Sequence, residues 1–193
     1  VLNWRTDTWT GSVRAGAPGL WLVEADESDR SLTAYRPTHT LITNVSRDHF
    51  DLAETREIFR EFADRTGRAV FAASGVADAI GGCPPGRGVH GHPALTYDGG
   101  LLRIGGRPVN LSLPGEHNRR NAWLAALAAL DLGTPPDTVR RALESFSGIR
   151  RRLQSAGEPR GVRVIDDYAH NPAKIRAALH AVRRTRGRTL AVF

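Results

Sequence analysis

Two groups of acidic side chains, the second with a histidine, each follow a short apolar run. The first group is Glu24, Asp26, Glu27 and Asp29. The second contains Asp48, His49 and Asp51. So many negative charges close together need a cation, a basic partner or water. A divalent metal bound by one carboxylate and one imidazole, with waters and phosphate oxygens at its other positions, would account for the pattern.

A structural interpretation competes with the metal site. Acidic residues after a strand often form a solvated loop, in which Ser28 or Asp29 would cap the next helix. In open α/β sheets, however, ligands gather at the carboxyl ends of strands. Two charged groups so close together, each at the end of a predicted strand, favour a ligand site.

The elements that must position these groups predict an α/β fold with a mostly parallel sheet and flanking helices. Residues 20–23, 41–42 and 69–71 are predicted as buried strands, and residues 53–65 as an amphipathic helix. A Gly- and Pro-rich stretch follows, and its short alternating runs predict a small antiparallel region. Those runs are residues 94–97, 101–104 and 109–113, with hairpin turns at Asp98-Gly99-Gly100 and Gly105-Gly106.

A third polar group opens the helix that is predicted after Pro114-Gly115. Its members are Glu116, His117, Asn118 and Asn121. An asparagine side chain offers one donor and one acceptor, the pair that an adenine edge requires. Capping of the helix by Asn118 is the structural alternative.

The best domain boundary lies at Gly148, after a short helix over 135–145. Two domains are therefore expected, residues 1–147 and 148–193. Arg150, Arg151 and Arg152 follow the boundary, as a solvated basic linker or as a phosphate-binding group. A strand over 162–165 then leads into D-D-Y-A-H-N-P, a helix over 173–186 and the start of a second strand over 188–193.

These motifs resemble those of the Mur ligases, ATP-dependent enzymes that add amino acids to the peptidoglycan precursor. The match covers E-A-D-E-S-D, T-N-V-S-R-D-H-F-D, G-E-H-N-R-R-N and D-Y-A-H-N-P, in the family's order. The first motif is most similar to the branch that adds L-alanine to UDP-N-acetylmuramate. The resemblance implies part of a P-loop-type central ATPase domain and the first βαβ unit of a Rossmann-like C-terminal domain.

The resemblance also implies roles for individual residues. Glu24 and His49 would bind Mg²⁺, with Asn44 and Asp48 shaping the loop around them. ATP would be held by Asn118 and Asn121 at the adenine, by Arg152 at the γ-phosphate and by Asp167 across the domain cleft, while His170 would lie near the acceptor. Arg152, Asp167 and His170 would be the catalytic group. The implied reaction is amide formation, in which a substrate carboxylate takes the γ-phosphate as an acyl phosphate and an amine then displaces phosphate.

Several features limit the expected activity. The chain begins with Val1, contains no methionine and has no G-x-x-x-x-G-K-[ST] phosphate loop. It is therefore expected to be a piece of a longer ligase, inactive by itself, with the UDP-N-acetylmuramate-type substrate and the amino acid held mostly outside it. The alternatives are a sister amide ligase, of another Mur, folylpolyglutamate or cyanophycin type, and a basic scaffold or nucleic-acid module.

Composition argues against the last alternative and against a membrane protein. The net charge is +7, but the arginines are mostly scattered and no nucleic-acid-binding motif accompanies them. No apolar run approaches the length of a membrane span. The single cysteine, Cys83, fits a reducing compartment, so a cytoplasmic protein without nucleic-acid or membrane partners is expected.

Overall fold

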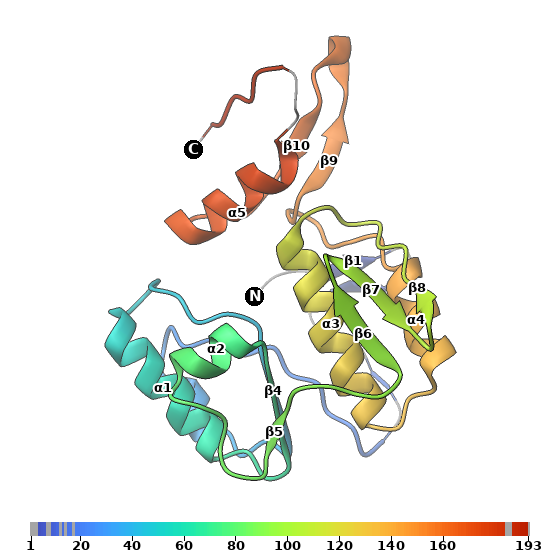
Figure 1. Cartoon of the computed structure of the whole chain (residues 1–193). Helices are drawn as coiled ribbons and strands as arrows, with labels where there is room; N and C mark the ends of the chain where they lie inside the picture. Colours follow the sequence, from blue (N-terminus) through green and yellow to red (C-terminus); the bar gives the residue numbers. More distant parts are fainter. Residues whose placement is uncertain are drawn as a thin grey trace.

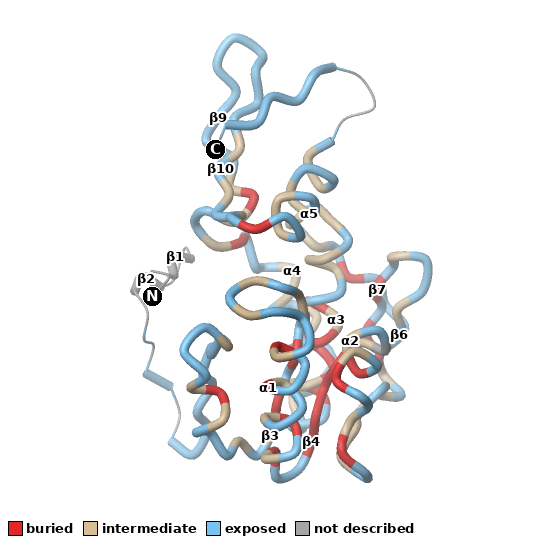
Figure 2. The backbone as a smooth tube through the Cα atoms, turned by 90° about the vertical axis from the view of Figure 1, so that its left-hand side faces the viewer, coloured by how far each residue is buried: buried red, intermediate tan, exposed pale blue. Residues whose placement is uncertain are grey.

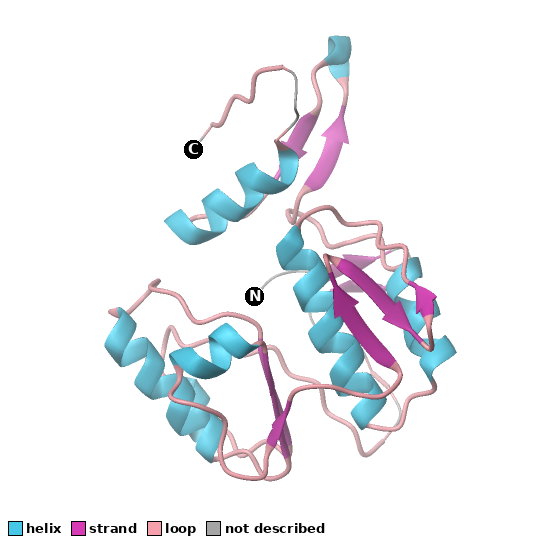
Figure 3. Ribbon diagram, in the orientation of Figure 1, coloured by secondary structure: helices cyan, strands magenta, loops and turns pink. Residues whose placement is uncertain are grey.

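The computed structural model describes residues 4–6, 9–11, 13, 15–16, 18–183 and 187–192. The strands are β1 (Trp4–Thr6), β2 (Trp9–Gly11), β3 (His39–Ile42), β4 (Ala69–Ala72), β5 (Gly88–Val89), β6 (Leu95–Asp98), β7 (Leu101–Ile104), β8 (Arg107–Pro108), β9 (Gln154–Gly157) and β10 (Val164–Asp166). The helices are α1 (Leu52–Asp64), α2 (Ser74–Ala79), α3 (Glu116–Asp131), α4 (Pro136–Ser145) and α5 (Pro172–Val182), with short 3₁₀ helices η1 (Ser31–Ala34) and η2 (Pro159–Gly161). Figure 3 shows this mixture of helices and strands. Among these elements no helix combines the length and apolarity needed to cross a bilayer.

A parallel sheet in the order β3-β4-β5 lies between two layers of helix. All of β4 is buried, and its side chains alternate between the two faces because successive residues of a strand point to opposite sides. Phe71 packs in one apolar cluster with residues of α3, and Val70 packs in another with residues of α1 and α2. Figure 1 shows α1 and α2 on one side of β4 and α3 on the other. The α/β fold with a parallel sheet and flanking helices is therefore confirmed.

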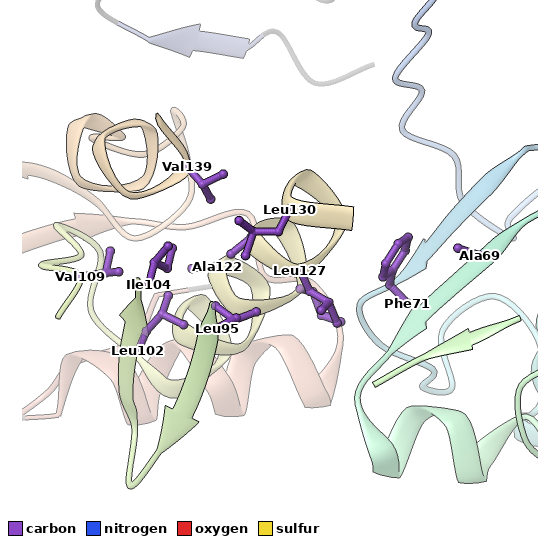
Figure 4. Close-up of a cluster of buried hydrophobic side chains, with 12 residues drawn as sticks. Ala69, Phe71, Leu95, Leu102, Ile104, Val109, Ala122, Leu127, Leu130 and Val139 are labelled. Carbon is purple, nitrogen blue, oxygen red and sulfur yellow. The ribbon is translucent and has the colours of Figure 1, made fainter. Parts of the chain in front are cut away.

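The larger apolar cluster joins this sheet to a small antiparallel one. Strands β6, β7 and β8 pair in that order, and Leu102 and Ile104 of β7 are buried against α3 together with Val139 of α4. In Figure 4 Leu127 of α3 lies between these residues and Phe71 of the parallel sheet. Helix α3 is thus the shared layer between the two sheets.

The last part of the chain, from β9 onward, is much less buried. Figure 2 shows it mostly in the exposed colour, whereas the buried segments concentrate at β4, α3 and β7. Strands β9 and β10 pair antiparallel, and α5 follows with no buried residue in its range. The side chains of α5 are therefore at most half-buried.

Three strand predictions are wrong in detail. Residues 20–23 lie in irregular structure with exposed side chains (Leu22 is 98% exposed), because β3 pairs only with β4 in the described part of the chain and nothing there covers an apolar strand. The third antiparallel strand is Arg107–Pro108 rather than 109–113, since the turn at Gly105-Gly106 brings those two residues beside β7. The segment 187–192 forms no strand, so the predicted βαβ unit is not completed there.

Candidate functional site

The first turn of α3 is held by the loop before it. Gly115, with φ of +99°, makes the turn into the helix, and the Asn118 side chain donates a hydrogen bond of 2.7 Å from Nδ2 to the carbonyl of Pro114. Asn118 therefore does not cap the helix N-terminus, where no side chain makes a capping bond. Within the part of the chain that the structure describes, no hydrogen bond engages its amide oxygen or the side chain of Asn121, one turn further on.

His117 lies on the same turn, and the pKa of its imidazole is affected by burial and by two charged residues. Its ring is half-buried, and this burial lowers the pKa of the imidazole below its ordinary value. The negative charge of Asp167 opposes this shift in pKa, and the positive charge of Arg152 adds to it. Arg152 of the linker and Asp167 of the D-D-Y-A-H-N-P motif thus both influence the pKa of a side chain in the first turn of α3.

Asp167 also has a structural role that sequence analysis did not anticipate. Its two carboxylate oxygens accept hydrogen bonds of 2.8 Å from the backbone N–H groups of Leu153 and Ala169. The bond from Leu153 joins the linker to the end of β10. The guanidinium of Arg151 lies 4.8 Å above the ring of Tyr168, a cation–π contact that joins the same two segments.

The first acidic group is used mostly for local turns. One oxygen of Asp26 accepts hydrogen bonds from the backbone and hydroxyl of Ser28, and Asp29 accepts one from the backbone N–H of Ser31. These bonds lower the pKa of both carboxyl groups, and for Asp26 the charge of His49 lowers it further. The solvated-loop interpretation therefore accounts for Asp26 and Asp29, although neither caps a long helix.

The structure places Glu24 and His49 on exposed loops before and after β3. No hydrogen bond or ion pair joins their side chains, and no three His, Cys, Asp or Glu residues converge as a metal-binding group within the described residues. Mg²⁺ usually keeps several waters and needs only one or two carboxylates from the protein. A carboxylate and an imidazole are donor groups that fit such an ion, so the Glu24–His49 site stays a prediction.

The charged group after β3 meets the start of α5. Asp48 Oδ2 lies 2.7 Å from Lys174 Nζ and 2.8 Å from Asn171 Nδ2, both donors, and 3.8 Å from His170 Nε2. Burial raises the pKa of Asp48, but the hydrogen bonds from Lys174 and Asn171 and the charges of Lys174 and His49 outweigh it and lower the pKa. His170, predicted near the acceptor, is thereby brought to the loop that carries His49.

Lys174 and His117 are the site residues that sequence reasoning missed. Lys174 is the only lysine among the 27 basic residues, which was the one available signal. His117 stands inside the G-E-H-N-R-R-N motif but was given no role. The pairing of Lys174 with a residue 126 positions away has no local signature in the sequence.

The comparisons with known proteins agree on one family. Residues 151–193 match the family model described as Mur ligase, glutamate ligase domain. A UDP-N-acetylmuramate--L-alanine ligase of Kineococcus radiotolerans is 38% identical over 95% of this chain, which spans 44% of that relative. The corresponding relative in Arthrobacter is also 38% identical, over 90% of this chain and 42% of its own length.

Solved structures agree with the sequence relatives. A UDP-N-acetylmuramate-alanine ligase of Thermotoga maritima superposes with a TM-score of 0.57 and 27% identity, covering 81% of this chain and 40% of that one. A pseudomurein peptide ligase type C of Methanothermus fervidus, at 21% identity, shares the fold with a TM-score of 0.63 over 81% of this chain and 43% of its own. The chain thus spans less than half the length of each of these relatives. Its sequence and fold place it in the Mur ligase family.

Proposed function

We propose that the chain is part of an ATP-dependent amide-forming ligase that adds L-alanine to UDP-N-acetylmuramate through an acyl phosphate. The class of reaction is supported by the relatives named for it, at 38% identity over most of this chain. The observation that carries the proposal is structural. A Cβ built on Gly115, at the start of α3, would lie 2.9 Å from Cβ of Ala181 on α5, so the first turn of α3 and the segment after the linker approach each other closely.

The proposed roles follow from side-chain chemistry at this meeting point. Asn121 and the amide oxygen of Asn118 would bind the adenine edge through donor and acceptor groups. Arg152 would bind the γ-phosphate, because a guanidinium stays charged and donates to phosphate oxygens in a fork. Asp167 has both oxygens on backbone N–H groups, so its contact to a nucleotide would add to an existing structural role.

Mg²⁺ is the proposed cofactor beside ATP, and Glu24 and His49 are its proposed ligands. A bound Mg²⁺ would offset negative charge on the transferring phosphoryl group. Other residues of the chain would orient the reactants from the side opposite the Mg²⁺ ion. Arg152 would neutralise phosphate charge. His170, on the D-Y-A-H-N-P loop, would face the acceptor. Domain closure would bring the two sides together.

We further propose that this chain alone does not turn over. It would comprise part of a central domain over 1–147 and the beginning of a C-terminal domain over 148–193. The UDP-N-acetylmuramate-type substrate and the amino acid would be bound largely by residues outside it. Nucleic-acid and membrane partners are not part of the proposal, and a cytoplasmic location remains a prediction.

An NMR titration of the 193-residue chain with Mg-ATP tests the nucleotide site. We expect weak binding, with the largest amide shifts at the start of α3, at Arg152 and around Asp167. Asn121→Ala and Arg152→Ala should each weaken binding, since each removes a proposed contact. Arg107→Ala, which removes an exposed arginine of β8, is the matched control and should leave binding unchanged.

Line broadening by Mn²⁺ in NMR spectra of the same chain tests the proposed metal site. Mn²⁺ replaces Mg²⁺ at oxygen and imidazole ligands and broadens nearby signals. We expect selective broadening at Glu24 and His49, reduced in Glu24→Gln. Line broadening by Mn²⁺ at other residues would reject Glu24 and His49 as metal ligands. Amide shift changes scattered over the surface would reject the nucleotide site. Micromolar affinity for Mg-ATP would contradict the proposal that the chain is only part of a ligase.

A further inference from the structure

The contact between the loop after β3 and the N-terminus of α5 is the most concentrated polar interaction between distant segments of the described chain. Asp48 Oδ2 accepts hydrogen bonds from Asn171 Nδ2 and Lys174 Nζ, across 123 and 126 residues of sequence. The bond from Lys174 is charge-assisted, which makes it stronger than one between neutral groups. The Asp48 side chain is only 13% exposed, so water screens this pair less than it screens the ion pairs on the exposed surface.

Asn171 both takes part in this contact and caps the N-terminus of α5. Its Oδ1 accepts a hydrogen bond of 2.9 Å from the backbone N–H of Lys174 and so caps α5, while its Nδ2 donates to Asp48. The residue is buried. The capping residue of α5 is therefore itself bonded to Asp48.

Little apolar packing supports this part of the chain. None of the residues of α5 is buried, and Pro172, Ile175 and Leu179 line an open hollow of about 420 Å³. Towards its C-terminal end α5 passes Gly115, where an added Cβ would lie 2.9 Å from Cβ of Ala181. Because hydrophobic burial is small here, the polar contact contributes a large share of what holds α5 in place.

The linker before β9 contains several residues with a left-handed backbone conformation, as expected of a hinge. Gly148, Arg151 and Leu153 adopt positive φ values of 105°, 60° and 49°. Positive φ is unfavourable for arginine and leucine, so these conformations are kept only while the surrounding contacts hold them. Release of α5 would let the linker relax.

We propose that Asp48, Asn171 and Lys174 form an electrostatic latch that holds the segment 154–182 closed against the loop after β3, and that breaking it lets this segment swing open about the linker 146–153. The latch goes beyond the proposed function, because it operates without nucleotide. It also gives the sole lysine of the chain a specific role. Closure of domains about a few hinge residues is a common form of conformational change.

Distance measurements between two spin labels on the full 193-residue chain test the latch. The labels are attached at Arg56→Cys on α1 and His180→Cys on α5, both exposed positions, with Cys83→Ser to remove the native thiol. With the latch intact, we expect one narrow distance distribution at low salt. Added salt should broaden it toward longer distances, because the Lys174 side chain is 37% exposed and salt therefore still weakens the ion pair.

Two substitutions open the latch in different ways. Lys174→Gln removes the positive charge, and Asn171→Asp keeps a good capping residue but replaces the donor to Asp48 with a second negative charge. Each should increase the long-distance population several-fold and leave little further response to salt. Far-UV circular dichroism checks that α5 still forms.

Asp137→Asn is the matched control, since it removes an acidic partner of Arg107 and Arg140 at an exposed site on α4. It should leave the distance distribution as in the parent chain. Opening in both latch variants but not in the control supports the latch. An unchanged distribution in either latch variant overturns it, and neither result depends on whether the chain binds ATP.

Discussion

The carboxylate of Asp167 accepts a hydrogen bond of 2.8 Å from the backbone N–H of Leu153, 14 residues earlier in the chain. Leu153 is buried and has a φ of +49°. The bond therefore satisfies a backbone group that has little access to water, in a conformation that leucine rarely adopts. It connects the linker, which carries Arg152, to the end of β10.

Replacing Asp167 by alanine should destabilise the chain even in the absence of any ligand. The backbone N–H groups of Leu153 and Ala169 would lose their acceptor, and we expect the free energy of unfolding to fall by about 1–3 kcal/mol. Urea denaturation measures this change. Asp166→Ala is the control, because Asp166 is exposed at the neighbouring position, and it should change the free energy by no more than about 0.5 kcal/mol. Equal effects of the two substitutions would show that the Leu153 bond contributes nothing specific.

The helices were predictable because their signals are local. The apolar spacing over 53–65 corresponds to α1 (Leu52–Asp64), and the proline before the fourth helix corresponds to α4 (Pro136–Ser145). The hairpin turns at Gly99-Gly100 and Gly105-Gly106 were predictable for the same reason, since all four glycines adopt positive φ. Each of these features depends on residues within a few positions of one another.

Strands and site contacts were less predictable because their partners are distant in sequence. Residues 20–23 have the composition of a buried strand, but a strand also needs a neighbour, and composition does not show whether one is present. The resemblance implied that Arg152 and Asp167 would contact ATP, and these contacts stay predictions. The motifs did not indicate that Asp48 would be engaged by Lys174, since that pairing depends on how the last part of the chain folds back.

Phe71 should be the most sensitive position of the parallel sheet. It is fully buried and packs with α3 residues in the cluster that joins the two sheets (Figure 4). Phe71→Ala should lower the free energy of unfolding by about 3–5 kcal/mol, through lost burial and the cavity left behind. Leu101→Ala, at a position 44% exposed on β7, should cost far less. Thermal and urea denaturation of both variants measure the difference, and comparable losses would contradict the central place of Phe71.

Gly115 should tolerate a methyl group much less well than Gly133, another glycine with positive φ. A Cβ there would lie 2.8 Å from the His117 ring and 2.9 Å from Ala181. Gly115→Ala should therefore displace α5 as well as strain the backbone. Gly133→Ala, with φ of +84° and no atom within 4 Å of the added Cβ, isolates the strain, about 1–2 kcal/mol. Denaturation should show a larger loss for Gly115→Ala, and amide shifts in α5 should change only in that variant.

Protonation of Glu116 should lower the stability of the folded chain at acidic pH. The hydrogen bond from the Tyr97 hydroxyl, followed by those from Arg119 and Arg120, lowers the pKa of Glu116 below its ordinary 4.5 despite partial burial. The folded state then binds fewer protons than the unfolded state in this pH range. The stability from Glu116 is therefore complete above pH 4.5 and is lost as the pH falls through the folded-state pKa.

Tyr97→Phe removes the largest of these interactions and keeps the aromatic ring. The pKa of Glu116 should rise toward its ordinary value, which NMR titration of the side-chain carboxyl measures directly. The gap between the folded and unfolded pKa values then narrows, so the loss of stability in acid becomes smaller. Tyr35→Phe, at an exposed tyrosine far from this carboxylate in the sequence, should leave the Glu116 titration unchanged. An unshifted Glu116 in Tyr97→Phe would mean that the two arginines, rather than the tyrosine hydroxyl, keep the carboxylate charged.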